Sequence, residues 1–342
     1  MQILNSHAYI RQRTAGIAPE MRFNTQEPFE VWQAKAKEKL TELLMLPLQS
    51  CEDDFQVTGQ RQCDGYTQTD FLFQTEPGYY VSASFLLPDG ITGPNATAIC
   101  LQGHSTGMHI SLGVEKFPGD DKTIAGGRDF AVRAVKEGLC AVAMEQRYMG
   151  TAGETPTGKP ACLDNSRNEA MAALLLGRCA IGERVWDIQR LIDVLYKHFA
   201  QFVDKEKLVC LGNSGGGTAT FYASCLDDRI CVSVPSCAVC TYDDSIMAMK
   251  HCPCNYIPNI RRFFNMGDLG CLIAPRKLVV VCGVEDHIFP LPGVEASFAT
   301  IQSAYDSLDK GGLCALVKGN GGHQFYPDEA WPVIHGYLEG TK

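Results

Sequence analysis

The sequence predicts an α/β fold in which a mostly parallel central sheet carries helices on both faces. Short apolar runs alternate with helix-compatible stretches from residue 97 to the C-terminus, which is typical of a parallel sheet with helical crossovers. The runs at 98–101, 139–144 and 277–282 are almost continuously apolar, as strands buried on both faces are. Residues 55–87 instead alternate and turn, which predicts antiparallel hairpins ahead of the parallel strands.

Composition excludes several classes of protein. The chain has 342 residues, of which 45% are hydrophobic and 20% charged, enough for one large domain or two modest ones. A disordered chain, a collagen-like repeat and a disulfide-stapled miniprotein are excluded. No stretch approaches the roughly 18 unbroken apolar residues of a membrane span, and the N-terminus lacks a signal-peptide pattern. We therefore expect a cytoplasmic protein without a membrane partner.

The charge balance argues against nucleic-acid binding. Lys and Arg number 30 and Asp and Glu number 39, so the net charge is −9, and no basic stripe is present. A polyanionic partner requires clustered positive charge. The expected partner is therefore a small molecule.

Sixteen cysteines are many for this length. In the reducing cytosol, the compartment expected for a chain without an export signal, cysteines stay thiols. Several lie within apolar strand-like runs, such as 208–211 and 280–282, where Cys behaves as a small core residue. We therefore expect packed thiols rather than disulfides.

The sequence predicts two structural units. Residues 27–46 carry an apolar stripe at helical spacing, so residues 1–50 are expected to form a helical extension packed on the core. With Phe29 and Trp32, this extension either covers the sheet or forms an interface in a homo-oligomer. Residues 51–342 are expected to form one α/β catalytic domain.

The remaining elements follow in order along the chain. Strands are predicted at 79–87, 207–211, 229–235 and 314–317, and helices at 130–137, 168–200, 294–308 and 328–338. Two stretches do not fit this alternation: 149–163, rich in Gly, Thr and Pro, and 237–270, a Cys-rich insert after the sixth strand. Loops of this length in a compact domain usually form lids, substrate walls or interfaces.

The strongest chemical signal is Gly212-Asn213-Ser214-Gly215-Gly216, which follows an apolar strand and precedes a helix-compatible run. Strand, Gly-x-Ser-x-Gly and helix together are the context of a nucleophile elbow, a sharp turn that lifts the serine above the sheet edge. Small residues two positions before and after the serine let strand and helix approach, and the helix N-terminus favours negative charge. Ser214 is thus the predicted nucleophile. The alternative is a glycine-rich turn that merely contains a serine.

A serine hydroxyl needs a base, and in this architecture the acid and then the histidine follow the serine along the chain. His323 lies in a glycine-rich loop after the last apolar strand, on the same sheet edge as Ser214, and is the predicted general base. Its alternative role is to cap backbone carbonyls. Of the other histidines beyond the serine, His335 falls in the final helix, His251 in the insert and His287 beside the acid.

The acid should end the strand that precedes this histidine. Glu285 and Asp286 both follow the strand at 277–282. Asp286 is the predicted acid, because a Gly-x-x-Asp turn closed by a proline aims a short carboxylate back across the edge. Its function would be to fix the imidazole tautomer and stabilise the imidazolium. The alternatives are Glu285, or two solvated acids on a turn.

An acyl-transfer site also needs an oxyanion hole. One N–H is expected from Gly215, directly after the nucleophile, and the second from the backbone of His104 in the loop after the strand at 98–101. The His104 side chain is either a substrate contact or structural. Asp187 and Arg190 lie on a helix beside apolar positions, where structural pairing is the expected role.

The motifs at 212–216, 283–290 and 321–323 together resemble the α/β-hydrolase superfamily. More narrowly, the chain looks like the acetyl-xylan-esterase and dienelactone-hydrolase-like branch. The stretches at 175–187 and 266–276 are similar to that branch too.

The resemblance covers roughly residues 60–340 and implies an α/β-hydrolase fold with carboxylester hydrolysis through an acyl-enzyme. Ser214, Asp286 and His323 would form the triad, and no cofactor would be needed. It also implies short acyl groups, such as acetyl on a carbohydrate, as the substrate. The stretch 102–104, Gln-Gly-His, departs from the more usual His-Gly start of the oxyanion loop.

Three other functions stay open from the sequence. A serine peptidase of the prolyl-oligopeptidase type shares the triad, but no propeller-sized segment precedes the hydrolase part. A non-catalytic binding protein on the same fold would be expected to lack a triad member. Metal-assisted hydrolysis would use Cys237-x-x-Cys240 and Cys252-x-Cys254 with His251. The second pair is spaced too tightly for the usual zinc knuckle, so we expect no metal site.

Overall fold

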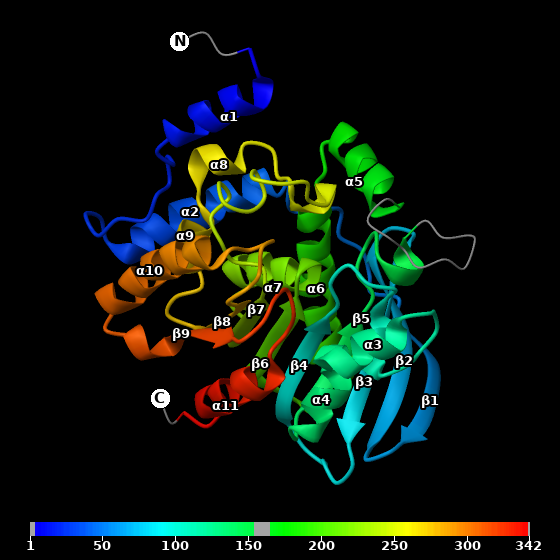
Figure 1. The fold of residues 1–342 in the computed structure, drawn as a ribbon. Coiled ribbons are helices and arrows are strands. Elements are labelled where there is room, and N and C mark those ends of the chain that lie inside the picture. The colour runs from blue at the N-terminus through cyan, green and yellow to red at the C-terminus, as the bar shows by residue number, and fades with distance from the viewer. Residues whose placement is uncertain (1–3, 154–164, 341–342) are drawn as a thin grey trace.

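The computed structural model describes residues 4–153 and 165–340 (Figure 1). The strands within these residues are β1 (Gln56–Cys63), β2 (Tyr66–Glu76), β3 (Tyr79–Pro88), β4 (Asn95–Leu101), β5 (Cys140–Met144), β6 (Val203–Asn213), β7 (Val232–Ser236), β8 (Lys277–Gly283) and β9 (Cys314–Gly319). They form one sheet in the order β1-β2-β3-β5-β4-β6-β7-β8-β9. From β5 to β9 all neighbours in this order pair in parallel, while β1, β2, β3 and β5 pair antiparallel. The predicted, mostly parallel sheet is confirmed.

One detail of the strand count differs from the prediction. The Cys-rich insert follows β7, the seventh strand in chain order, rather than the sixth. The difference lies within 55–87, where antiparallel hairpins are predicted without separate strand bounds and the structure has three strands, β1, β2 and β3. β1 lies at the edge of the sheet, and none of its residues is buried.

Helices surround this sheet. Those in the described residues are α1 (Ser6–Ala15), α2 (Phe29–Leu43), α3 (Asp120–Thr123), α4 (Phe130–Lys136), α5 (Asn165–Leu175), α6 (Ala180–His198), α7 (Gly215–Leu226), α8 (Ile260–Phe263), α9 (Met266–Cys271), α10 (Leu291–Ser307) and α11 (Pro327–Leu338). No helix in this part of the chain is long and apolar enough to cross a membrane.

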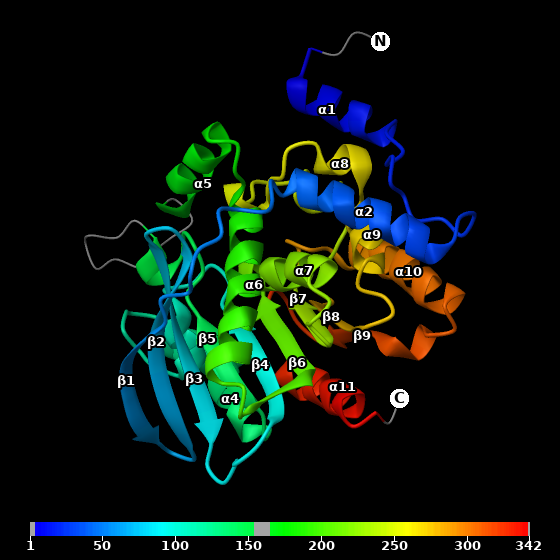
Figure 2. The same ribbon diagram turned by 180° about the vertical axis from the view of Figure 1, so that it is seen from behind.

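The helices cover both faces of the sheet, as predicted (Figures 1 and 2). On one face α2, α6, α7 and α10 bury apolar side chains in the larger core, among them Trp32, Ile188 and Phe221. On the other face α4 and α11 pack through side chains such as Phe130 and Trp331. The first helix, α1, lies outside these two layers at the N-terminal end of the molecule.

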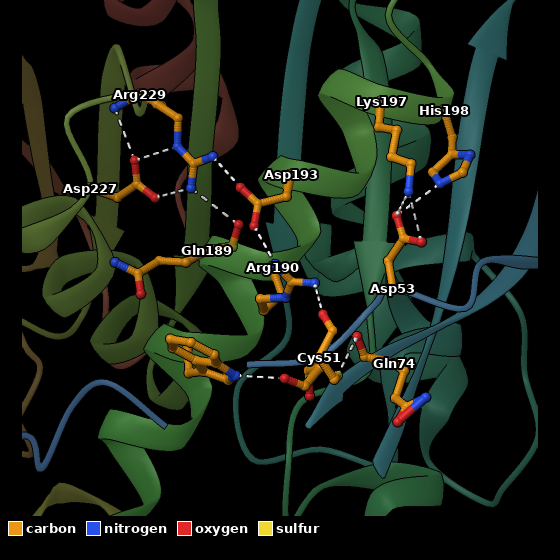
Figure 3. Close-up of polar contacts among 12 residues, drawn as sticks. Cys51, Asp53, Gln74, Gln189, Arg190, Asp193, Lys197, His198, Asp227 and Arg229 are labelled. Carbon is orange, nitrogen blue, oxygen red and sulfur yellow. Dashed lines mark hydrogen bonds and ion pairs between the residues drawn. The ribbon is translucent and has the colours of Figure 1, made fainter. Parts of the chain in front are cut away.

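The outer side of α6 is held by polar contacts to segments on either side of it (Figure 3). Arg190 donates to the carbonyl of Cys51 at 2.9 Å and pairs with Asp193 at 2.9 Å. Asp193 also pairs with Arg229, in the turn before β7. On the next helical turn, Lys197 pairs with Asp53 at 3.0 Å. Arg190 thus has the structural role expected of it.

The parallel strands bring distant loops together. The carboxyl ends of β4, β6, β7, β8 and β9 meet at one edge of the sheet because these strands run in the same direction. Ligands of open α/β sheets bind outside this edge. The insert 237–270 begins here and contains α8 and a 3₁₀ turn, Pro253–Asn255. Of the other irregular stretch, residues 154–163 lie outside the described residues.

The cysteines of the described residues are unpaired thiols, as expected, and most of them are buried. Cys210 and Cys282, for example, are part of the larger core. Cys162 lies outside the described part of the chain.

Candidate active site

Ser214 occupies a sharp turn between β6 and α7. Its backbone angles are φ 56° and ψ −121°, a conformation that residues with a side chain rarely adopt. The Ser214 N–H donates to the carbonyl of Ser236 in β7 at 2.9 Å, which holds the turn against the neighbouring strand. Backbone strain of this kind persists where the surrounding structure imposes it, most often at functional sites.

Two glycines permit this turn. A Cβ on Gly212 would lie 2.7 Å from the carbonyl oxygen of Leu101, and a Cβ on Gly216 would overlap the same oxygen. Because neither position has a side chain, α7 can approach the backbone of β4 closely. This is the steric requirement that the Gly-x-Ser-x-Gly spacing predicts.

Asp286 and His323 are in direct contact at the ends of β8 and β9. The Oδ2 atom of Asp286 lies 2.8 Å from Nδ1 of His323, and Oδ1 accepts the backbone N–H groups of Ile288 and Phe289 at 2.8 and 3.1 Å. Burial would raise the pKa of Asp286, but the contact with His323 and these N–H groups hold it below its ordinary value. An ionised carboxylate only accepts hydrogen bonds, so Nδ1 carries the proton and Nε2 of the neutral ring is free to act as a base.

The alternative residues lie elsewhere. Glu285 and His287 are exposed on the turn that holds Asp286. His335 lies on α11, and its Nε2 atom is 2.9 Å from Oε2 of Glu137. His251 lies in the insert, and its Nε2 atom is 3.3 Å from Oγ of Ser245. Among the described histidines beyond the serine, only His323 bonds to the predicted acid.

The loop after β4 lies beside Ser214. β4 and β6 pair in parallel with Leu101 opposite Gly212, so the residues that follow each strand are neighbours. A Cβ on Gly103 would lie 3.0 Å from the Cβ of Ser214. Gly215 is the first residue of α7, so its N–H has no acceptor inside the helix. The two segments expected to supply the oxyanion hole therefore flank the nucleophile.

The side chain of His104 points toward the insert. Its Nδ1 atom lies 2.9 Å from the position that a Cβ of Gly215 would take, so the ring packs against the start of α7. Its Nε2 atom lies 3.3 Å from Sγ of Cys254. Of the two roles left open by the sequence, this contact within the chain favours the structural one.

Arg128 is a charged neighbour that sequence reasoning missed. One of its Nη atoms lies 3.3 Å from Oε1 of Gln102 and 3.1 Å from the Cβ position of Gly103. Burial lowers the pKa of Arg128 to about 10, and its Nε atom has no hydrogen-bond partner among the described residues. A positive charge beside the loop favours negative charge developing near Ser214. No motif around Arg128 signals this position.

Glu145, directly after β5, is a second buried carboxylate that the sequence analysis does not single out. Its oxygens accept the backbone N–H groups of Met108 and Thr151, both at 3.2 Å. Burial raises the pKa of Glu145 to about 7 in spite of these hydrogen bonds. The signal available in the sequence is an acid placed immediately after five buried apolar residues.

Asp187 is structural, as expected, but its partner is not Arg190. Its carboxylate is buried in α6 and accepts two hydrogen bonds from Arg147, at 2.7 and 2.8 Å. Arg147 also contacts Glu76 of β2 at 2.7 Å. This network joins α6 to the antiparallel part of the sheet.

The cysteines of the insert do not form one four-ligand set. Cys240 contacts the carbonyl of Pro290, whereas Cys237 lies with Asp286 and His323. Cys252 and Cys254 lie instead beside His104. The structure therefore separates the two Cys pairs from which the rival metal site was composed, and His251 joins neither group.

Comparison with known proteins places the chain in a family. The Abhydrolase family matches residues 3–306. YtaP of Bacillus subtilis, described as a candidate hydrolase, is 26% identical over 153 residues, which is 44% of this chain and half the length of that relative.

Solved structures agree in fold. A protein of Bacteroides fragilis described as a candidate acetyl xylan esterase has a TM-score of 0.78 and 18% identity, covering 93% of this chain and 83% of its own. A glucuronoyl esterase of Solibacter usitatus has a TM-score of 0.66 and 12% identity, covering 95% and 98%. Acetyl xylan esterase 1 of a Thermoanaerobacterium species has a TM-score of 0.56 and 14% identity, covering 96% and 98%. The fold is that of the α/β hydrolases, and the chain belongs to the Abhydrolase family.

Proposed function

We propose that the protein is a serine carboxylic ester hydrolase that acts through an acyl-enzyme, with short acyl esters of carbohydrates as its substrates. The observation that carries this proposal is the strained Ser214 turn at the sheet edge where Asp286 and His323 form a 2.8 Å pair. A nucleophile, a base and an acid that orients the base are the groups that acyl transfer through serine requires.

The first half of the reaction forms the acyl-enzyme. Oγ of Ser214 attacks the ester carbonyl while Nε2 of His323 takes the hydroxyl proton. The backbone N–H groups of Gly215 and His104 donate to the resulting oxyanion, and the positive charge of Arg128 stabilises it further. Asp286 stabilises the imidazolium. His323 then returns the proton to the leaving alcohol, and the C–O bond to the alcohol breaks.

The second half regenerates the enzyme. Water enters in place of the alcohol and loses a proton to Nε2 of His323 as it attacks the acyl carbon. The tetrahedral intermediate collapses, Oγ of Ser214 recovers the proton from His323, and the carboxylic acid leaves. Every proton that moves passes through His323, so the protein needs no other acid or base for either half.

The substrate class rests on two supports. The chain resembles the acetyl-xylan-esterase branch at the motifs around Ser214, Asp286 and His323. Structural neighbours include acetyl xylan esterases, which are named for acetyl esters of a carbohydrate. Short acyl groups on sugars are therefore the first substrates to test.

The test is hydrolysis of p-nitrophenyl esters from acetyl to octanoyl by wild type, Ser214→Ala and Ser224→Ala. Ser224 is a matched control because its buried hydroxyl lies on α7, ten residues beyond the elbow. We expect acetyl to react fastest, Ser214→Ala to lose at least about a thousandfold in kcat, and Ser224→Ala to lose little. Full activity in Ser214→Ala, or no ester turnover by wild type, would exclude the proposed function. Acetylated xylo-oligosaccharides then test the sugar.

A further inference from the structure

Three side-chain atoms that can bind a metal ion lie close together between the insert and the loop beside Ser214. Sγ of Cys254 lies 3.0 Å from Sγ of Cys252 and 3.3 Å from Nε2 of His104. All three donor atoms lie within 4.8 Å of one another. His104 comes from the loop after β4 and the cysteines from the 3₁₀ turn of the insert, 150 residues later.

The two cysteines of this Cys₂His cluster are buried, and His104 is half-buried. Cys252 and Cys254 are 6% and 3% exposed and pack against Ala170 of α5 and Ala180 of α6. A buried pair of thiols in contact with an imidazole has no packing advantage over three apolar side chains. The convergence therefore calls for a chemical reason rather than a packing one.

Arg184 places a positive charge near the cluster. It lies on α6 one helical turn beyond Ala180, which packs against the two cysteines. Its guanidinium is buried and donates twice to the carbonyl of Arg147, at 3.0 and 2.9 Å, while its Nη1 atom has no partner among the described residues. Cysteine binds metal ions as the thiolate, a form that nearby positive charge favours.

Two thiolates and one imidazole are the protein ligands of a zinc ion that keeps a fourth position open. Tetrahedral zinc with its usual bond lengths places two sulfurs about 3.8 Å apart and sulfur and nitrogen about 3.6 Å apart. Sγ of Cys254 lies 3.0 Å from Sγ of Cys252 and 3.3 Å from Nε2 of His104, and the third pair lies within 4.8 Å, so the ligands need to move by about an ångström. Side-chain rotations on a turn and a loop can produce a movement of this size.

We propose that His104, Cys252 and Cys254 bind a zinc ion, with water as the fourth ligand. The two thiolates neutralise the charge of the ion. The ion joins the loop that borders Ser214 to the Cys-rich insert, which fixes the ring of His104. The site shares His104 with the proposed oxyanion hole, where the backbone N–H of that residue is the donor, but zinc binding by its side chain does not require ester hydrolysis.

The test is the zinc content of the whole protein, purified without chelators and without metal-affinity chromatography. We expect about one zinc per chain in wild type and less than about a tenth in Cys254→Ser, since loss of one of three ligands weakens binding strongly. Cys237→Ser is the matched control, because Cys237 is a buried thiol of the same insert in the other candidate group, with Asp286 and His323. It should retain its zinc.

A second measurement keeps the proposal testable if Cys254→Ser does not fold. Wild type stripped of metal is titrated with zinc and with cobalt. Zinc should raise Tm by about 5 °C, because it binds the folded state, and cobalt should give the intense near-ultraviolet absorption of thiolate ligation.

Three outcomes overturn the proposal. Wild type that contains no metal and takes up neither ion has no such site. Loss of zinc in Cys237→Ser with retention in Cys254→Ser places the ion in the other group. A Cys252–Cys254 disulfide, seen as a mass two daltons lower, that yields no zinc binding after reduction assigns the pair to redox chemistry instead.

Discussion

Two buried carboxylates, Asp286 and Glu145, each lie just after a strand of this sheet, and they contact different donor groups. Asp286 follows β8 and is 3% exposed, and Glu145 follows β5 and is 4% exposed. Each accepts two backbone N–H groups. Asp286 also contacts His323, whereas the third donor to Glu145 is the hydroxyl of Thr151. The pKa of Asp286 lies below its ordinary value, while burial raises that of Glu145 to about 7.

This difference shows what a buried carboxylate needs in order to stay charged. Glu145 is buried more deeply among protein atoms than Asp286, and two backbone N–H groups and a hydroxyl do not offset that cost. At Asp286 two N–H groups and an imidazole that can take a positive charge do offset the smaller cost. Only the arrangement at Asp286 keeps an ionised carboxylate in contact with a histidine that can act as a base. We infer that Asp286 acts in the reaction and that Glu145 joins two turns, those at 107–108 and 150–151.

The largest expected effect is on turnover. Asp286→Asn should lower kcat by about ten thousandfold, because the amide no longer fixes the tautomer in which Nε2 of His323 accepts a proton. Glu145→Gln, the matched exchange at the other strand end, should lower kcat by less than about tenfold, since Glu145 does not contact His323. Initial rates on p-nitrophenyl acetate at pH 8 measure both. Equal losses in the two variants would mean that Glu145 belongs to the catalytic machinery.

The next effect is the change of stability with pH, which has opposite signs at Glu145 and Asp286. The pKa of Glu145 is raised from 4.5 to about 7 on folding. The unfolded chain therefore loses the proton first, and stability falls as pH rises from about 4.5 to 7, by about 3 kcal/mol in total. Glu145→Gln removes this dependence. Urea unfolding of wild type and variant at pH 4 to 8 gives the difference.

Asp286 provides the control for that sign. Its pKa is lowered on folding, so its contribution is present above the ordinary value of 3.8 and is lost as pH falls below it. The difference between wild type and Asp286→Asn should therefore stay constant from pH 5 to 8 and shrink only in acid. If the two differences varied with pH in the same direction, the comparison between the sites would be wrong.

The smallest effect concerns a single hydrogen bond. Thr151→Val removes the hydroxyl that lies 3.3 Å from Glu145 and should cost about 1 kcal/mol at pH 8, where the carboxylate is charged. Thr151→Ser retains the hydroxyl and should restore the stability. The loss in Thr151→Val should become smaller at pH 4, where Glu145 is protonated. A loss independent of pH would show that the methyl packing of the side chain has changed instead.

The predictable part of this molecule is the part encoded locally. A buried parallel strand is an apolar run, and the residues just beyond it reach the sheet edge. The few residues around Ser214, Asp286 and His323 therefore predict that they lie at this edge, and the structure brings Asp286 and His323 into contact there. The same logic predicted the strands from β3 onward. For β1 and β2 it predicted antiparallel hairpins without strand bounds, and an edge strand such as β1, with no buried side chain, carries no apolar period that would give them.

The unpredicted part depends on contacts between distant segments. Arg128 lies near Ser214 only because the loop after β4 folds against the elbow, and the partner of Asp187 is 40 residues away in Arg147. His104 and Cys254 meet across 150 residues. The rival metal site would have used two Cys pairs of the insert together, Cys237 with Cys240 and Cys252 with Cys254. The structure separates these two pairs.

Covalent labelling tests whether Ser214 is a nucleophile activated through Asp286 and His323 and not through Glu145. Wild type, Asp286→Asn and Glu145→Gln are treated with a fluorophosphonate, and the modified residue and its rate of modification are measured by peptide mass spectrometry. We predict a single adduct on Ser214 that forms at the wild-type rate in Glu145→Gln and at least about a hundredfold more slowly in Asp286→Asn. An adduct on another residue, or equal rates in the two variants, would contradict the account.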